Sequence, residues 1–132
     1  VEVRLDLRSE ASIRAYSIQL YQVIMNLCTN AFQAMEERGG VLTVSLVDGP
    51  ASGRARQVLL EFRDTGAGIP EELRSHIFEP YFTTKENGKG TGLGLSVVHG
   101  IVEGMQGAIR VESAVGMGTS FLITLPAAHL TL

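Results

Sequence analysis

The stretch GKGTGLGLSVVHGIVEGM, residues 88–105, decides how the rest of the chain is interpreted. Its first seven residues hold four glycines, and apolar residues then recur at the spacing of a helix with one apolar face. A glycine-rich loop that leads into a helix presents free main-chain N–H groups and the positive end of the helix dipole, and both suit phosphate oxygens. The stretch contains no GxxxxGK(S/T) motif and follows no predicted strand, so it matches neither a P-loop nor a dinucleotide-binding loop. The glycines are Gly88, Gly90, Gly92 and Gly94, and the apolar residues are Val97, Val98, Ile101, Val102 and Met105.

Length, composition and charge limit the class of protein. The 132 residues predict one domain that is long enough to bury a core. A net charge of −3 without any basic run argues against a nucleic-acid partner, and no apolar run is long enough to span a membrane. The single cysteine, Cys28, excludes an internal disulfide and lies in phase with apolar residues of a helix, so we expect it in the core. The chain starts and stops close to predicted strands, as a domain excised from a longer protein would.

Hydrophobic patterns over the whole sequence predict an α+β fold. Alternating apolar residues predict five strands, the first of them half-buried, and helical spacing predicts three helices. Their order along the chain predicts a two-layer α/β sandwich. In it about three helices cover one face of a mixed five-stranded sheet, and the other face meets solvent. The predicted strands are 1–8, 41–47, 57–63, 108–113 and 119–126; the predicted helices run from Ser17 to Gly39-Gly40, over 70–78, and from the glycine-rich stretch to Met105.

Neutral amide side chains form a stripe along the long predicted helix. Gln22, Asn26, Asn30 and Gln33 follow one another at spacings of four, four and three, which places them on one side of the helix. The stripe can be a solvated face, but such a face normally carries Lys and Glu, and the first charge here is Glu37. Amide oxygens are suitable ligands for Mg²⁺ when phosphates supply the negative charge.

A carboxylate follows the strand predicted at 57–63. Asp64 continues the parity of the apolar residues of that strand, so its side chain should point toward the core. A buried carboxylate needs hydrogen-bond donors, and a ligand amine such as that of adenine would supply one. The alternative is a solvated aspartate in a DxG turn. Thr119 shares the parity of the apolar residues in the last strand, so its hydroxyl should point into the same layer.

Five short motifs occur in a fixed order and together resemble one family. They are NLCTNAFQAM (26–35), DTGAGIP (64–70), IFEPYFTTK (77–85), GKGTGLGLS (88–96) and GMGTSF (116–121). They resemble the N box and the glycine and F boxes of sensor histidine kinases. The whole chain, residues 1–132, resembles the catalytic ATP-binding domain (HATPase_c) of the GHKL superfamily, which has the Bergerat fold.

The resemblance implies a role for each matching residue. Asn30 would hold the Mg²⁺ that bridges the ATP phosphates, Asp64 would accept a hydrogen bond from the adenine amine, and residues 79–92 would form a lid over the nucleotide. Asn26, Asn30 and Lys85 would serve catalysis. The nucleotide would contact Asn30, Gln33, Ala34, Asp64, Gly66, Gly68, Ile69, Phe82, Lys89, Gly90, Thr91, Gly92, Leu93, Gly94, Leu95 and Thr119.

Some positions depart from the commonest family pattern. Gln33 stands where many relatives carry a basic residue, Tyr16-Ser17 where Asp-Pro is common, and Met105-Gln106 where His-Gly is frequent. The related ATPases also carry a glutamate as general base four residues before the metal-binding asparagine. This chain has Asn26 there, which favours phosphoryl transfer to a histidine over hydrolysis.

The resemblance also implies what lies outside the chain. His76, His99 and His129 lack the sequence context of a phosphoacceptor, so the acceptor histidine would lie on a dimerising helical domain of the same parent protein. The parent would be a homodimer, anchored in a membrane in some members of the family, and its partner a response-regulator receiver domain. The domain itself would be cytoplasmic. A GHKL-type ATPase and a nucleotide-binding module without catalysis remain as alternatives.

Overall fold

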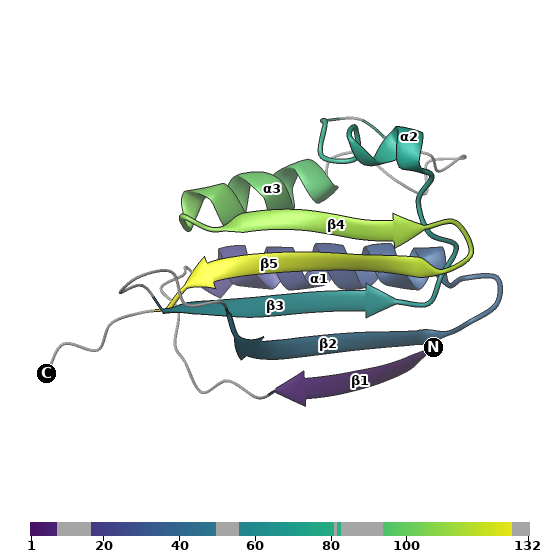
Figure 1. Cartoon of the computed structure of the whole chain (residues 1–132), viewed down its shortest axis with the longest axis horizontal. Helices are drawn as coiled ribbons and strands as arrows, with labels where there is room; N and C mark the ends of the chain where they lie inside the picture. Colours follow the sequence, from purple (N-terminus) through teal and green to yellow (C-terminus); the bar gives the residue numbers. More distant parts are fainter. Residues whose placement is uncertain (8–16, 50–55, 81, 83–93, 128–132) are drawn as a thin grey trace, which may run out of the picture.

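Five strands form one sheet, and the helices lie on one side of it (Figure 1). The computed structural model describes residues 1–7, 17–49, 56–80, 82 and 94–127, and the structural statements below refer to these residues. The elements are β1 (Glu2–Leu7), α1 (Ser17–Ala34), β2 (Val41–Asp48), β3 (Gln57–Asp64), α2 (Glu71–Arg74), α3 (Gly94–Gly104), β4 (Ala108–Ala114) and β5 (Gly118–Pro126).

The strands lie in the order β1-β2-β3-β5-β4. β1 pairs with β2 in parallel, and the other three pairs are antiparallel, so the predicted mixed sheet is confirmed. The predicted boundaries agree with the observed ones to within two residues for all the strands. The antiparallel pairing of β3 with β5 sets Asp64 opposite Thr119, and that register places the two side chains on the same face.

Two predicted helices are shorter than expected. α1 ends at Ala34 rather than at the glycine pair, and the chain then turns until the Gly39 N–H donates to the Met35 carbonyl at 2.8 Å. The helix predicted over 70–78 is α2, which ends at Arg74. Beyond it the N–H groups of His76 and Glu79 bond to carbonyls three residues back, which tightens the chain into turns.

The core lies between the sheet and the inner faces of α1 and α3. Both helices present apolar residues at helical spacing, and β3 and β5 present alternate residues to the same layer. Cys28 packs against this core, as expected, but is only half-buried, and this burial raises the pKa of its thiol. The fully or nearly fully buried side chains include Val23, Leu27, Val58, Phe62, Val98, Val102, Phe121, Ile123 and Leu125.

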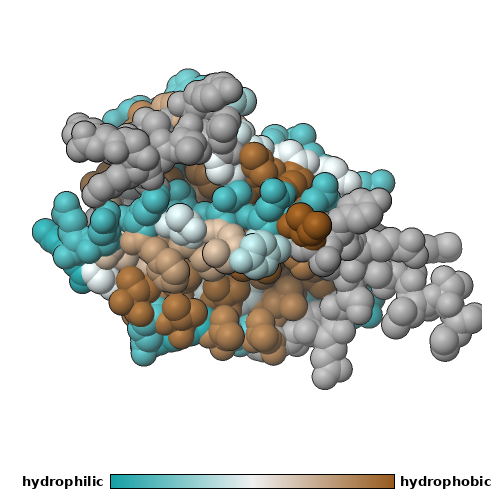
Figure 2. All heavy atoms as spheres, turned by 180° about the vertical axis from the view of Figure 1, so that it is seen from behind, coloured by the Kyte–Doolittle hydropathy of each residue, from teal (hydrophilic) through white to brown (hydrophobic). Residues whose placement is uncertain are grey.

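The prediction that β1 is half-buried is wrong. Val3, Leu5 and Leu7 point to the helix side of the sheet beside apolar residues of β2, yet all three are mostly exposed. The physical reason is that α1 packs over β2, β3 and β5, while β1 is the edge strand and no described helix covers it. The row of apolar side chains along this edge is visible from the helix side (Figure 2).

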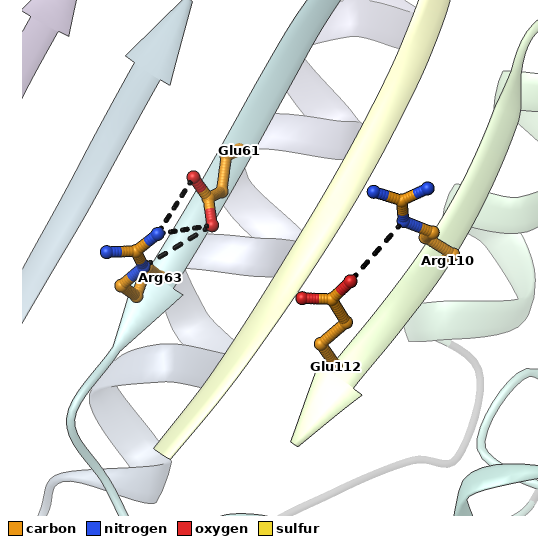
Figure 3. Close-up of polar contacts among 4 residues, drawn as sticks. All are labelled: Glu61, Arg63, Arg110 and Glu112. Carbon is orange, nitrogen blue, oxygen red and sulfur yellow. Dashed lines mark hydrogen bonds and ion pairs between the residues drawn. The ribbon is translucent and has the colours of Figure 1, made fainter. Parts of the chain in front are cut away.

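The opposite face of the sheet carries ion pairs along single strands. Glu61 and Arg63 pair on β3 at 3.1 Å, and Arg110 and Glu112 pair on β4 at 3.7 Å (Figure 3). Leu122 of β5 lies opposite Glu61 and Arg110 and is only 7% exposed, because the long side chains on either side cover it. The predicted solvent-facing side of the sheet therefore carries charged side chains, with apolar residues such as Leu59 and Leu122 between them.

Gln106 ends the turn after α3 in a backbone conformation that favours glycine. Its φ is 62°, and among the described residues it is the only non-glycine residue with positive φ. This is the position where the family frequently has Gly, and glycine would relieve a cost of about 1 kcal/mol.

None of the described helices combines the length and the apolar character needed to cross a membrane.

Two leucines on neighbouring strands test this account of burial. Leu42 of β2 is 1% exposed, and Leu5 of β1 is 68% exposed on the same side of the sheet. Leu42→Ala should lower the free energy of unfolding by about 2–5 kcal/mol, whereas Leu5→Ala should change it by about 0.5 kcal/mol or less. Urea unfolding of both variants measures this. Equal losses would mean that β1 is covered in solution.

Candidate functional site

The carboxylate of Asp64 lies buried at the end of β3. The side chain is 5% exposed, so the predicted direction toward the core is confirmed. The Gly66 N–H donates to Asp64 Oδ1 at 2.9 Å, and the Thr119 main-chain N–H also bonds to the carboxylate. An ionised carboxylate has about four acceptor positions. Two donors reach it from the described residues, which leaves acceptor capacity for the N–H of a ligand.

Burial and hydrogen bonding act on Asp64 in opposite directions. Removal from water raises the pKa of the carboxyl above its ordinary value of 3.8, and the N–H groups of Gly66 and Thr119 lower it in part. The net direction is upward. A further N–H donor supplied by a ligand would favour the ionised form, so binding of such a ligand and ionisation of Asp64 should support each other.

The loop after Asp64 passes very close to the end of α1. The Ala67 N–H donates to the Ala34 carbonyl at 3.2 Å, and a Cβ placed on Gly66 would lie 2.6 Å from that oxygen. Any side chain at position 66 would therefore push the loop away from the helix. The structure thus brings together Ala34, Asp64 and Gly66, three of the predicted nucleotide contacts.

Two more glycines allow the loop and the β4–β5 turn to meet. Gly68 has a φ of +78°, and a Cβ there would collide with the Ala114 carbonyl. Gly118 has a φ of +91°, and a Cβ there would collide with the Asp64 main-chain oxygen. Gly68 was a predicted site residue, but Gly118 was not, because its sequence context indicates only a turn between two strands.

Ser113 of β4 joins the same cluster, and sequence reasoning missed it. Its Oγ accepts a hydrogen bond from the Ile69 N–H at 2.8 Å and lies 2.9 Å from both the Gly118 carbonyl and Thr119 Oγ1. The sequence does predict the direction of this side chain. Ser113 continues the alternation that places Ile109 and Val111 on the core side of β4, as Asp64 does on β3. Thr119 is 5% exposed, as predicted, and lies in the same layer as Asp64.

The amide stripe of α1 runs from this cluster toward the start of α3. Asn26 Nδ2 donates to the carbonyl of Gly94, the first residue of α3, at 3.4 Å. Asn26 and Ala34 are two helical turns apart, about 12 Å along the axis. Asn30 lies between them and is half-buried. α1, which lies behind the sheet in Figure 1, therefore contacts the loop after Asp64 with its last residue and the first residue of α3 with its middle.

The remaining predicted site residues divide into those that the structure describes and those that it does not. Gln33 is half-buried on α1, Leu95 of α3 packs against the core, and so does Phe82, whose ring lies 6.0 Å from that of His76. The other group lies outside the described residues, so its predicted contacts stay predictions. It comprises Lys85, Lys89, Gly90, Thr91, Gly92 and Leu93, and with them most of the predicted lid.

Charged side chains that could serve as metal ligands are scattered. No three His, Cys, Asp or Glu side chains gather closely enough to hold a metal ion in the ranges that the structure describes. His76 pairs with Glu79 at 3.0 Å, and His99 pairs with Glu103 at 3.4 Å. A divalent ion at Asn30 would need its negative ligands from the phosphates of a bound nucleotide, which agrees with the neutral character of the stripe.

Comparison with known protein sequences gives extensive matches. Residues 15–129 match the family model described as histidine kinase-, DNA gyrase B-, and HSP90-like ATPase. The chain is 48% identical over 118 residues to the sensor kinase CckA of Brucella abortus (strain 2308), covering 82% of this chain and 12% of that protein. It is 40% identical over 128 residues to sporulation kinase E of Bacillus subtilis (strain 168), covering 96% and 16%. The chain thus spans less than a fifth of the length of these relatives.

Solved structures give the same result. The mycobacterial sensor histidine kinase MprB aligns with a TM-score of 0.81 and 27% identity over 98% of this chain and 85% of its own. Full-length ShkA in complex with AMPPNP aligns with a TM-score of 0.80 and 27% identity over 99% of this chain and 26% of its own. The predicted sandwich fold and the predicted family resemblance are confirmed.

The buried carboxyl group makes a prediction about pH. Because the pKa of Asp64 is raised in the folded state, that state holds the proton more tightly than the unfolded chain does. The contribution of Asp64 to stability should therefore be greatest at low pH and decline as the pH rises above 3.8 through the raised value. Urea unfolding of the protein and of Asp64→Asn from pH 4 to 7 measures the difference. If the difference in free energy of unfolding between the protein and the variant stays constant, or grows in favour of the aspartate as the pH rises, the raised pKa of Asp64 is contradicted.

Proposed function

Because the chain belongs to the family of histidine kinase-, DNA gyrase B- and HSP90-like ATPases, we propose that it binds Mg-ATP and transfers the γ-phosphoryl group to a histidine on a separate helical domain of its parent protein. The phosphoryl group then passes to an aspartate of a response-regulator receiver domain. Asn26 is the observation that carries the proposal: an amide, and not a carboxylate, contacts the start of α3 where the related ATPases have their catalytic base.

Asp64 gives the base-binding end of the proposed site its preference for adenine. Its buried carboxylate keeps acceptor capacity beyond the bonds from Gly66 and Thr119, and the exocyclic amine of adenine is a donor of suitable size. Guanine would present a carbonyl oxygen there, and two acceptors would face each other in a buried space. The close approach of Gly66 to Ala34 leaves no room for a side chain between the loop and the helix.

Asn30 occupies the phosphate-binding end of the proposed site. Its amide oxygen would be the protein ligand of Mg²⁺, which when bound neutralises charge on the transferring phosphate. Gln33 would lie near the nucleotide as a neutral neighbour where many relatives have a basic residue. Lys85 and Lys89 would supply positive charge. The backbone of residues 90–94 would then surround the phosphate oxygens.

The reaction requires positioning more than acid–base chemistry. A histidine nitrogen attacks the γ-phosphorus, the bond from that phosphorus to the bridging oxygen breaks, and ADP leaves. A neutral imidazole nitrogen already has a lone pair, so it needs no base. Water does need one, and Asn26 cannot accept a proton. Hydrolysis by the isolated chain should therefore be slow.

The acceptor histidine is proposed to lie outside this chain. Among the described histidines, His76 pairs with Glu79 in the turns after α2, and His99 pairs with Glu103 on α3. Neither contacts Asn26 or Asp64 through any described hydrogen bond. The chain also spans less than a fifth of the length of CckA and of sporulation kinase E, and both proteins are named as kinases. The helical domain of the parent protein, as a homodimer, is the proposed partner.

Asn30→Ala tests the transfer reaction directly. With Mg-ATP and the separate helical domain, the unmodified chain should produce an acid-labile, base-stable phosphohistidine. Asn30→Ala should reduce the rate to about 1% or less, because charge on the transferring phosphate is no longer neutralised. Thr29→Ala, at an exposed neighbouring position on α1, is the matched control and should keep full activity. Transfer by Asn30→Ala at the normal rate would exclude the proposed role of Asn30, and ATP binding without any transfer by the unmodified chain would favour the non-catalytic module.

Asn26→Glu separates the kinase from the ATPase. The substitution places a carboxylate where the related ATPases have their base. It should raise phosphate release from Mg-ATP by about 10- to 100-fold, less than the roughly 10²–10⁴-fold that a well-positioned base supplies. Asn26→Gln has the same shape as glutamate without a basic oxygen and should leave hydrolysis slow. Brisk hydrolysis by the unmodified chain would overturn the kinase assignment and support the ATPase alternative.

A further inference from the structure

We infer that Ser113 is a positioning residue for base recognition: its hydroxyl fixes the Thr119 hydroxyl and the main chain at Ile69 on either side of the Asp64 carboxylate. The inference rests on the proposed nucleotide-binding function and extends it to a residue on β4, a strand that contributes none of the predicted contacts.

Three separate segments meet at Ser113 Oγ. The Ile69 N–H, from the loop that follows Asp64, donates to it at 2.8 Å. Ser113 donates in turn to the Gly118 carbonyl at 2.9 Å, at the end of the β4–β5 turn. Thr119 Oγ1, the first inward side chain of β5, lies at 2.9 Å. One hydroxyl therefore holds the loop, the turn and the strand that surround the carboxylate.

The proton count fixes the direction of these bonds. Ser113 has one hydroxyl proton, and it goes to the Gly118 carbonyl. The contact between the two hydroxyls must then use the proton of Thr119, so Thr119 donates to Ser113 Oγ. That oxygen accepts from both Ile69 and Thr119, and its hydrogen-bonding capacity is filled.

The consequence appears at Thr119. With its proton committed to Ser113, the threonine oxygen can offer only lone pairs to its surroundings. Thr119 lies directly opposite Asp64 in the β3–β5 pairing, with Cβ atoms of such pairs about 4.5–5.5 Å apart. Two acceptors thus stand side by side in a buried layer. This arrangement favours a purine with an amine at C6, which can donate to the two acceptors directly or through a water, over a purine with a carbonyl at C6.

Removal of the serine hydroxyl should weaken this preference. The Thr119 proton would lose its acceptor, the hydroxyl could rotate and offer that proton to the site, and a C6 carbonyl would then be tolerated better. The Ile69 N–H would lose its partner as well. Loss of hydrogen bonds of this kind corresponds to about a tenfold change in affinity.

The matched variants are Ser113→Thr and Ser113→Val. The two new side chains have the same shape and the same preference for strands, and they differ only in a hydroxyl against a methyl group. Calorimetry on the 132-residue chain would measure the affinities for ADP and for inosine diphosphate, which carries oxygen at C6. The protein and Ser113→Thr should prefer ADP, whereas Ser113→Val should lose about tenfold in ADP affinity with little change for inosine diphosphate. Ser113→Ala, which adds no atoms, should behave like Ser113→Val.

The ratio of the two affinities separates positioning from general loosening. A merely structural role would weaken both nucleotides equally in Ser113→Val and Ser113→Ala, and an unchanged ratio would overturn the inference while leaving the proposed function intact. If the unmodified chain binds neither nucleotide, or does not prefer ADP, the proposed function itself fails and the inference fails with it. A collapse of the ratio in the variants without the hydroxyl, with rescue by threonine, is the expected result.

Discussion

The burial of one carboxylate constrains the structure around the site. Asp64 is 5% exposed, and removal of a charge from water is costly unless donors replace the solvent. Two main-chain N–H groups do so, one from Gly66 in the next loop and one from Thr119 on the paired strand. Both must come close, and the glycines at 66 and 118 permit that approach. The loop, the turn and the strand end are thus placed by the need to solvate one side chain.

The long helix α1 extends this arrangement to the rest of the proposed site. Ala34, near its end, contacts the loop around Gly66, and Asn26, two turns earlier, contacts the first residue of α3. One helix therefore holds the loop beside the Asp64 carboxylate and the neutral amide of Asn26 at a fixed separation. The absence of a carboxylate at Asn26 matters as much as the presence of one at Asp64, because a site that binds Mg-ATP without a base restrains hydrolysis and leaves the phosphoryl group for a stronger nucleophile.

Sequence periodicity correctly predicted the face of the sheet on which a side chain lies, but not whether a helix covers that face. Alternation fixed the face on which Asp64 and Thr119 lie, because the side-chain period of a strand is two. The same argument failed for Leu5, since alternation says which face a residue occupies but not whether a helix covers that face. The position of β1 at the sheet edge is a tertiary property. Ser113 was missed although it continues an apolar alternation, because a serine near the end of a strand is unremarkable by itself. The need for glycine at position 118 depends on the Asp64 main chain, far away in sequence.

The most direct measurement is the titration of Asp64 by carbon-13 NMR of its carboxyl group, without nucleotide and with saturating ADP. Burial should place the pKa of free Asp64 above 3.8. Bound ADP should lower that pKa, because an amine that donates to the carboxylate stabilises its ionised form. An Asp64 pKa that ADP leaves unchanged or raises would show that the carboxylate does not bind the base, and the account of the site would be wrong.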